Sequence, residues 1–154
     1  MTTRRNPEKG SALPSTDHAL RYIKPTHIDN GVINGQGFLP RSGENAPSAN
    51  WMEWFDPPPD NQVASIRRIS RIKYARTGYL VALNVGQTLK FVRDNSTIPA
   101  AIKFMHMPLV ETNGLPADPS HCEIQGFSEV SPSEAALLGD LMVQCAIRPY
   151  YPAS

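Results

Sequence analysis

The sequence predicts an α+β fold: a single domain with a mostly antiparallel sheet and about three helices. Its 154 residues correspond to one ordinary domain. Segments typical of strands and of three unequal helices follow one another without the strict strand–helix alternation of parallel sheets. Pro and Gly supply 25 residues (15 plus 10), fewer than in low-complexity chains, so we expect the chain to fold around one core.

The first segment is predicted to be a flexible arm over residues 1–17. Leu13 is its only sizeable apolar side chain beyond the first residue, which is too little to offset the entropy of ordering the segment. A single folded domain is expected to span residues 18–154 and to begin with a strand over 19–23. Short extended pieces and tight turns should follow up to Arg41, because glycines are frequent there.

A short helix is predicted next, because Ser48 can act as its N-cap and the prolines at 57–59 would end it. Asn50 and Glu53 are three residues apart and would share one helical face. A hydroxyl, an amide and a carboxylate would then meet at the positive end of a helix, where an anion or nucleotide can bind with Trp51 as a stacking surface. The alternative is a capped helix that anchors its tryptophans in the core, with Glu53 in solvent.

A second helix is expected over 60–74, where apolar residues recur at every third position. This spacing drifts around a helix, so the stripe either contacts two neighbours or its last turn is a strand. The segment 60–76 carries five basic residues and one acidic residue, a net charge of +4. Its face with Arg67, Arg68 and Arg71 can meet the phosphates of a nucleic acid or an acidic protein partner. The alternative is a solvated helix face.

The second half of the chain alternates strand and helix signals. The continuous apolar run 79–85 predicts a central strand buried on both faces. Residues 88–92 are either extended or helical. Further strands are expected over 102–110, 121–127 and 147–151, the last at an edge of the sheet. Ser131, Pro132 and Glu134 form a capping box, which predicts a helix from 132 to about 145.

His121 and Glu123 would lie on the same face of their strand, and a histidine beside a carboxylate can act as a base near neutral pH. The alternative is a surface or hydrogen-bonded histidine. The sequence leaves open a metal site shared by His27, His106 and His121, and we predict no metal and no cofactor.

The absence of known motifs argues against common kinases, P-loop NTPases, Rossmann dehydrogenases and zinc proteases of the H-E-x-x-H type. It contains no G-x-x-x-x-G-K-[ST], G-x-G-x-x-G, H-E-x-x-H or G-x-S-x-G motif. Two cysteines cannot form a disulfide framework, and with no signal peptide and no membrane span we expect a cytoplasmic protein without a membrane partner. The net charge of +1 gives no overall field towards nucleic acid, so any basic site is local.

Three motifs resemble a family of small uncharacterised bacterial proteins: Leu20-Arg21-Tyr22-Ile23-x-Pro25, Ser48-x-Asn50-Trp51-x-Glu53 and Pro119-x-His121-x-Glu123-Ile124-x-Gly126. This resemblance spans residues 20–145 and implies a bacterial domain in which these segments share one site or one core. The family carries no activity that could be transferred. Arg21 ahead of the glycine-rich stretch is also similar to the first strand of ADP-ribosyltransferase-like folds, in which an Arg or His meets NAD.

Two functional hypotheses follow. The leading one is a bacterial binding or accessory protein that acts on a protein or nucleic-acid partner through Ser48, Asn50, Glu53, His121 and the Arg67–Arg76 face. The alternative is a toxin-like enzyme that acts on NAD, a nucleotide or nucleic acid, with Arg21, Glu53 and His121 in one pocket. A structural subunit that forms oligomers through its C-terminal tyrosines is the third reading, and the sequence leaves the oligomeric state open.

Overall fold

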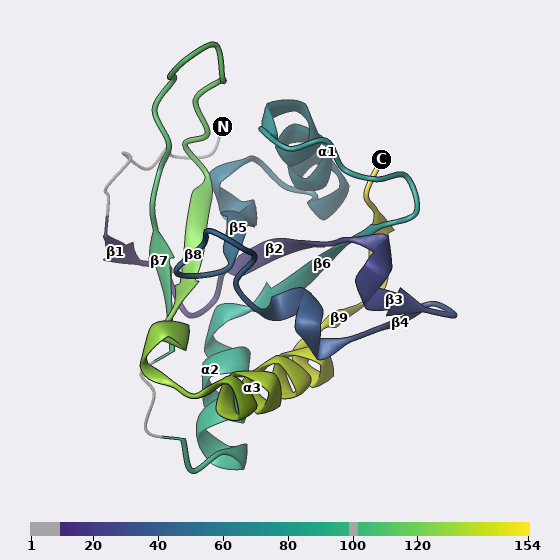
Figure 1. Ribbon diagram of the computed structural model, residues 1–154. Helices are drawn as coiled ribbons and strands as arrows, with labels where there is room; N and C mark the ends of the chain where they lie inside the picture. Colours follow the sequence, from purple (N-terminus) through teal and green to yellow (C-terminus); the bar gives the residue numbers. More distant parts are fainter. Residues whose placement is uncertain (1–9, 99–101) are drawn as a thin grey trace.

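The computed structural model describes residues 10–98 and 102–154 and shows a single α+β domain (Figure 1). In this part of the chain, seven strands form a sheet in the order β1-β7-β8-β5-β2-β6-β9, and every neighbouring pair is antiparallel. The predicted fold class is confirmed. The strands are β1 (Ser11–Ala12), β2 (His18–Ile23), β5 (Ser48–Trp51), β6 (Tyr79–Asn84), β7 (Lys103–His106), β8 (His121–Gln125) and β9 (Ile147–Pro152), and β3 (Ile28–Asp29) and β4 (Val32–Ile33) form a small second sheet.

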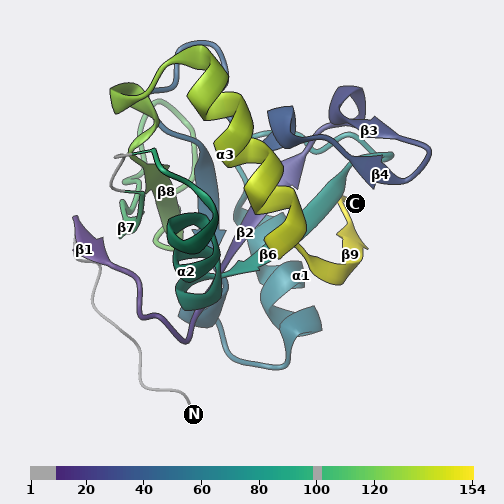
Figure 2. The same cartoon turned by 90° about the horizontal axis from the view of Figure 1, so that it is seen from below.

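Helices cover both faces of the large sheet, as Figures 1 and 2 show together. Helix α1 lies on one face, and α2 and α3 lie on the other. The strands serve both layers by alternation: Leu20 and Leu80 pack with α1, whereas Ala19 and Val81 pack with α2 and α3. The helices are α1 (Pro59–Ile69), α2 (Val85–Asn95) and α3 (Pro132–Cys145), with short 3₁₀ helices η1 (Pro25–His27), η2 (Gly35–Phe38), η3 (Met52–Trp54) and η4 (Phe127–Glu129).

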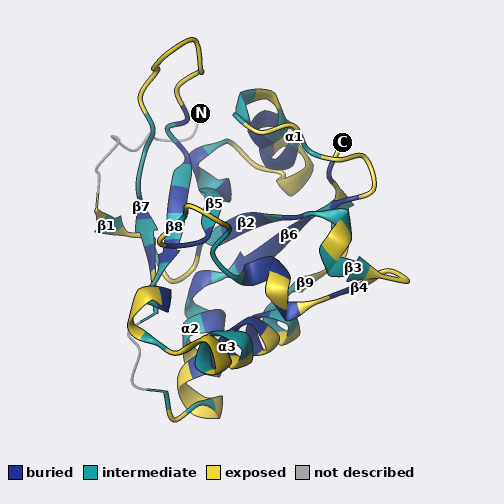
Figure 3. Cartoon of the chain, in the orientation of Figure 1, coloured by how far each residue is buried: buried dark blue, intermediate teal, exposed yellow. Residues whose placement is uncertain are grey.

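The sheet interior is buried on both faces, which Figure 3 shows as dark blue along β2 and β6. The apolar run at 79–85 forms β6, and its four middle residues are all buried. The predicted central position of this strand is wrong: β6 lies second from the edge of the sheet, and β5 is the central strand. The predicted edge strand at the C-terminal end is confirmed, because β9 pairs with the outer side of β6. On β9, the Tyr150 ring lies 5.4 Å from the ring of Tyr79, so this part of the C-terminal end is engaged within the chain.

The prediction of a helix at 48–55 is wrong. Ser48–Trp51 is strand β5, which pairs with β2 on one side and β8 on the other, and a single 3₁₀ turn follows it. Ala49 and Trp51 are buried, whereas Ser48 and Asn50 are partly exposed, which is the period-two pattern of a strand. Two neighbouring strands supply backbone partners that outweigh the local capping signal. Ser48 is therefore not an N-cap.

The other helix predictions are partly correct. Helix α1 ends at Ile69, so the predicted extension to 74 is wrong, and Arg71 lies in the following loop. The segment left open at 88–92 belongs to α2, where the Asn84 side chain accepts a hydrogen bond from the Gln87 amide at 2.8 Å. Helix α3 and its capping box are confirmed as predicted. The described residues thus contain three α-helices, the number predicted, but residues 85–95 form one of them and residues 48–55 do not.

Ordered structure begins earlier than the predicted arm allows. Residues 1–9 lie outside the described residues, but β1 pairs with β7, and Leu13 belongs to the core with 5% of its surface exposed. The physical reason is that the edge of β7 orders this segment through backbone hydrogen bonds, such as that from the Leu13 amide to the Phe104 carbonyl at 2.9 Å. The described residues 10–17 therefore belong to the folded domain and not to an arm.

Both cysteines are free: Cys122 is buried in β8 and Cys145 is half-buried at the end of α3. Burial raises the pKa of the Cys122 thiol, so it remains a packed, protonated side chain. In the portion of the chain that the structure describes, no helix is both long enough and apolar enough to cross a bilayer.

Candidate functional site

A cavity of about 230 Å³ opens on the α1 face of the sheet. Its floor is one row of side chains from three neighbouring strands: Leu20 on β2 pairs with Asn50 on β5, and Asn50 pairs with His121 on β8. The walls come from the 41–48 segment, the loop after α1 and the connection between β7 and β8. Antiparallel register therefore brings together residues that are far apart in the sequence.

A hydrogen-bonded polar network underlies the floor of this cavity. The Asn50 amide Nδ2 donates to Asp118 Oδ2 and to Ser120 Oγ, each at 2.9 Å. Asp118 Oδ1 accepts from the Ser120 amide at 3.1 Å and from its hydroxyl at 2.8 Å. Asp118 and Ser120 are buried, with 4% and 0% of their surfaces exposed. The network holds Asn50 in one orientation, and its donors satisfy the buried carboxylate.

His121 is anchored through one ring nitrogen. Nδ1 lies 2.7 Å from the Met107 carbonyl oxygen, which only accepts, so we assign the proton of the neutral ring to Nδ1. Nε2 is then the basic nitrogen, and within the described residues it has no hydrogen-bond partner. Because His121 lines the cavity and is only partly buried, a ligand there can reach this nitrogen.

Two tyrosines form an aromatic wall. The rings of Tyr22 and Tyr74 lie 4.7 Å apart at 37°, and both residues line the cavity. The Ala75 amide donates to Tyr22 Oη at 2.9 Å, which ties the loop after α1 to β2. Burial raises the pKa of the Tyr74 phenol, so the ring remains neutral. This wall offers flat apolar surface beside the polar floor.

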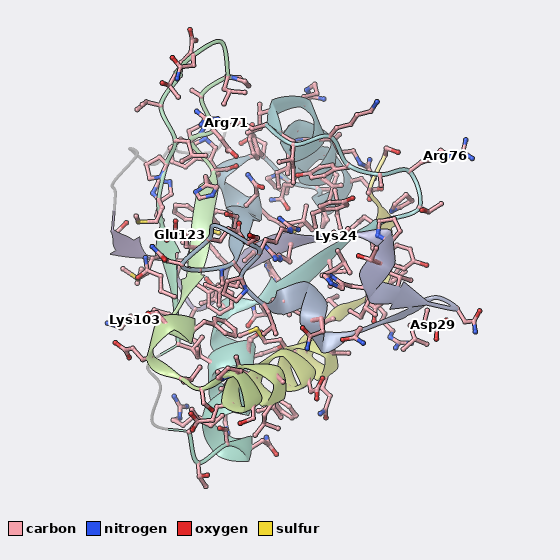
Figure 4. The ribbon with its side chains drawn as sticks, viewed as in Figure 1. Lys24, Asp29, Arg71, Arg76, Lys103 and Glu123 are labelled. Atoms are coloured by element: carbon pink, nitrogen blue, oxygen red, sulfur yellow. The ribbon has the colours of Figure 1, made fainter. Side chains whose placement is uncertain are left out.

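Arg41 and Arg71 bring positive charge to the cavity from two different segments of its wall. Arg41 Nη2 donates to the Tyr22 carbonyl at 2.8 Å, and its Cζ lies 5.5 Å from the centre of the Tyr22 ring. Arg71 donates from Nε to the Pro116 carbonyl at 2.8 Å and from Nη2 to the Val110 carbonyl. Each guanidinium keeps further N–H groups beyond these bonds. Arg71 also ties the loop after α1 to the β7–β8 connection, where Figure 4 labels it.

The carboxylate on the Arg41 wall is already engaged. Glu44 Oε1 accepts from the Arg41 backbone amide at 2.7 Å, and Glu44 Oε2 accepts from the Ser48 hydroxyl at 3.0 Å. Asp118 is satisfied by the floor network in the same way. Both acidic groups of the cavity therefore have internal donors, and within the described residues the two arginines donate to neutral carbonyl groups. The formal charges of the two arginines and the two carboxylates cancel, but the guanidinium groups keep N–H donors that a ligand anion could use.

Arg21 does not line the cavity. It is adjacent to Leu20 in β2, so alternation turns it to the other face of the sheet, where it is buried with 1% exposed. Its guanidinium donates to the carbonyl oxygens of Gly37 at 3.0 Å, Leu39 at 3.0 Å and Ser48 at 2.7 Å. Burial lowers its pKa to about 9, so it stays protonated at neutral pH. Arg21 therefore binds backbone carbonyl groups inside the protein. It is not exposed to meet NAD, as the resemblance to ADP-ribosyltransferase-like folds implied.

Glu53 lies away from the cavity and pairs with His18 at the start of β2. Glu53 Oε2 is 2.6 Å from His18 Nδ1, and Oε1 accepts from the His18 amide at 2.7 Å. Trp51 is also buried and donates from Nε1 to Asp17 Oδ2 at 2.8 Å, so its ring is not a stacking surface for a ligand. The structure therefore does not place Arg21, Glu53 and His121 in one pocket.

The His18–Glu53 pair predicts a pH-dependent stability. The hydrogen bond that the His18 ring donates to Glu53 raises the pKa of His18, against the opposing effect of burial. Because the folded pKa exceeds the unfolded value of about 6.5, this contribution is complete below that pH and is lost as the pH rises through the folded pKa. We therefore expect Glu53→Gln to reduce the free energy of unfolding more at about pH 5.5 than at about pH 9. Urea denaturation of both proteins at the two pH values measures this, and an equal loss at both would contradict it.

His27, His106 and Glu123 do not line the cavity, and His27 lies in η1. His106 is buried, lies 2.7 Å through Nε2 from the Pro119 carbonyl and contacts the ring of Trp51. Glu123, which Figure 4 labels, accepts from Gln125 Nε2 at 3.2 Å. It lines a different hollow from His121, so the two do not form a catalytic histidine–carboxylate pair. Among the described residues, no group of three or more His, Cys, Asp or Glu side chains is placed to hold a metal ion.

The predicted basic face is divided by the end of α1. Arg67 donates to the Pro152 carbonyl and Arg68 donates to Ser65 Oγ at 3.0 Å, so both contact their own surroundings on or beside the helix. Arg71, beyond the helix, lines the cavity. The structure thus brings Ser48, Asn50, Arg71 and His121 of the predicted site into one cavity and leaves the other predicted residues outside it.

Sequence reasoning missed Asp118, the two tyrosines and Arg41. Asp118 precedes His121 by three residues, between two predicted strands. Its closeness in sequence to a candidate histidine could have marked it as a candidate site residue. The pairing of Asn50 with His121 was not visible, because it depends on the register of β5 against β8.

Comparison with known protein families, curated proteins and solved structures finds no match for this chain.

Proposed function

We propose that this protein binds a nucleotide-like ligand, a flat ring that carries an anionic group, in the cavity on the α1 face of the sheet. The observation that carries the proposal is the combination of three kinds of group around one cavity. Tyr22 and Tyr74 supply aromatic surface, Asn50 and His121 supply hydrogen-bonding groups, and two arginines supply positive charge.

The ring part of the ligand would contact the tyrosine wall and the polar floor. Nε2 of His121 can accept a hydrogen bond, and Asn50 Oδ1 is a further acceptor because Nδ2 is committed to Asp118 and Ser120. A nucleobase presents N–H groups along its edge and a flat face for stacking. These features match an acceptor-lined floor beside tyrosine rings.

The anionic part would contact Arg41 and Arg71. The guanidinium group is suited to phosphate because its planar N–H groups can bind two oxygens at once. Glu44 and Asp118 have their own hydrogen-bond donors within the chain, so neither carboxylate occupies the guanidinium groups. A phosphate or carboxylate on the ligand could therefore accept from the remaining N–H groups of Arg41 and Arg71.

Calorimetric titration with adenosine and uridine monophosphates tests the proposal, with adenosine and inorganic phosphate titrated separately. We expect a nucleotide to bind more tightly than either fragment, and Arg71→Gln to weaken it roughly tenfold through the loss of one charge-assisted contact. Arg93→Gln is the matched control, because Arg93 is exposed on α2 at the other face of the sheet. Absence of saturable nucleotide binding, or equal weakening by the two variants, would overturn the proposal.

A second candidate function is catalysis in the same cavity. It is favoured by the anchoring of His121, because the carbonyl of Met107 fixes Nδ1 and leaves Nε2 to accept a proton from a bound ligand. In this reading, His121→Gln abolishes turnover of a bound nucleotide or NAD with little effect on its affinity. Turnover that survives this substitution would exclude His121 as the base.

A further inference from the structure

A second hollow adjoins the cavity across the loop after α1. This groove has a volume of about 640 Å³ and is lined by three basic residues together with Ser154 and neighbouring residues that are mostly apolar. The basic residues are Arg67, Lys73 and Arg76. Ile72 and Tyr74 line both hollows, so the segment 70–76 forms the boundary between them. We call this stretch the basic segment.

The basic segment presents its cations to both sides. Arg71 lines the cavity, whereas Lys73 and Arg76 line the groove and are exposed, and Figure 4 labels Arg71 and Arg76 at opposite ends of the segment. No Asp or Glu is among the described residues that line the groove. In the same part of the chain, no carboxylate pairs with Lys73 or Arg76.

Arg67 adds an unsatisfied donor on the other side of the groove. Its Nη2 donates to the Pro152 carbonyl, but its buried Nε has no hydrogen-bond partner among the described residues. A buried N–H group without an acceptor costs free energy. Because Nε is buried, a ligand in the groove would contact Arg67 through its other guanidinium nitrogens. The groove therefore combines three cations, and among the described residues no carboxylate forms a salt bridge with Lys73 or Arg76.

We infer that the nucleotide in the cavity is one residue of a single-stranded nucleic acid whose phosphates continue across the basic segment into the groove. This inference rests on the proposed function. The cavity, at about 230 Å³, is smaller than the roughly 300–1,000 Å³ of sites that enclose a whole drug-sized ligand. It therefore fits one unstacked base better than a complete larger ligand, and the cationic groove beside it supplies the contacts that a continuing backbone needs.

The chemistry of the two hollows favours nucleic acid over an acidic peptide. Aromatic rings beside a cationic groove are the combination by which proteins hold single strands, since every base has a flat face and every linkage a phosphate. An acidic peptide would use the groove but would leave the tyrosine wall and Asn50 without a function. A single strand is favoured over a duplex as the ligand, because a duplex base would first have to be unpaired and unstacked to enter the cavity.

Fluorescence anisotropy tests the inference with labelled single strands of about ten nucleotides, as RNA and as DNA of the same sequence, at several salt concentrations. We expect a single strand to bind more tightly than the mononucleotide. A plot of the logarithm of its association constant against the logarithm of salt concentration should have a slope of about −0.7 per phosphate contact. A preference between RNA and DNA identifies which strand is the source of the nucleotide. The corresponding duplex and poly-glutamate are the competitors, and neither should displace the strand at equal charge concentration.

The decisive variant is the double substitution Lys73→Gln/Arg76→Gln. Both side chains are exposed, and Lys90→Gln/Arg93→Gln on α2 is the matched control, with the same two residue types at the same spacing. We expect the groove variant to weaken strand binding at least tenfold and to lower the salt slope by about 1.4, since two phosphate contacts are lost. The control should leave both quantities unchanged.

The failure of this inference can be distinguished from the failure of the proposed function. If mononucleotides bind but a strand binds no more tightly, or if the groove variant behaves like its control, the inference is wrong and the cavity proposal stands. If duplex or poly-glutamate competes equally with the strand, the inference is also wrong. If neither mononucleotide nor strand binds, both proposals are wrong.

Discussion

Replacing Arg21 with Met is expected to lower the free energy of unfolding by roughly 3–5 kcal/mol. The guanidinium is the shared donor for the carbonyl groups of Gly37, Leu39 and Ser48. Met fills much of the same volume but donates nothing, so carbonyl groups beside a buried side chain lose their partner. Urea denaturation followed by circular dichroism measures the change.

Two further variants control this experiment. Arg93→Met removes an exposed arginine from α2 and should change stability by less than about 0.5 kcal/mol. Arg21→Lys should give an intermediate loss, because an ammonium group cannot reproduce the planar fork that reaches three carbonyl groups. Equal stability of Arg21→Met and the wild type would show that these carbonyl groups are satisfied without Arg21.

The same substitution connects stability with the cavity. Leu39 and Ser48 flank the segment that carries Arg41 and Glu44, so Arg21 holds both ends of one cavity wall from beneath. Arg21 is therefore a positioning residue. For the milder Arg21→Lys variant, we expect a loss of nucleotide affinity at temperatures where the protein remains folded.

Gly139→Ala is expected to destabilise the protein by roughly 1–3 kcal/mol, although alanine normally favours a helix over glycine by about 1 kcal/mol. Gly139 lies in α3 against η2, where an added methyl group would collide with the carbonyl oxygen of Gly35 and lie 3.0 Å from its carbonyl carbon. The neighbouring atoms are backbone, which cannot move aside as a flexible side chain can. Thermal or urea denaturation measures the sign.

Gln144→Ala on the same helix is the matched control. Gln144 is exposed, so alanine there should leave stability unchanged or raise it slightly. If Gly139→Ala also stabilised the protein, the close approach of α3 to η2 would not be a constraint. The two alanine substitutions on one helix are thus expected to differ in their effect on the free energy of unfolding. This difference separates the effect of packing from that of helix propensity.

Local signals were enough to predict an element where a short motif by itself specifies the structure. The capping box at Ser131 and Glu134 predicted the start of α3, and the apolar run of β6 predicted a strand buried on both faces. Such signals act over a few residues, so they survive without knowledge of the partners. The single-domain α+β fold followed from the order of these elements.

Local signals failed where a distant partner decided the outcome. Ser48 has the chemistry of an N-cap, but β2 and β8 supply backbone hydrogen bonds to both sides of its segment, and a strand results. The same cause explains the end of α1 at Ile69: the Arg71 side chain binds carbonyl groups of the β7–β8 connection. Tertiary contacts outweigh propensities of a few tenths of a kilocalorie per residue.

The candidate site shows the same division. Asn50, Arg71 and His121 stood out in the sequence because amide, guanidinium and imidazole groups carry chemistry, and the structure places them around one cavity. Arg21 and Glu53 stood out for the same reason, yet alternation along β2 and the pairing with His18 remove them from it.

The sequence by itself determined the elements with strong local signals, the single-domain α+β class and the supply of reactive side chains. Only the tertiary structure decided which of those side chains meet. The physical reason is the register of an antiparallel sheet: a shift of one residue in β5 would turn Asn50 away from His121 and bury it on the other face. That register is set by the packing of helices on both faces, which no single segment specifies.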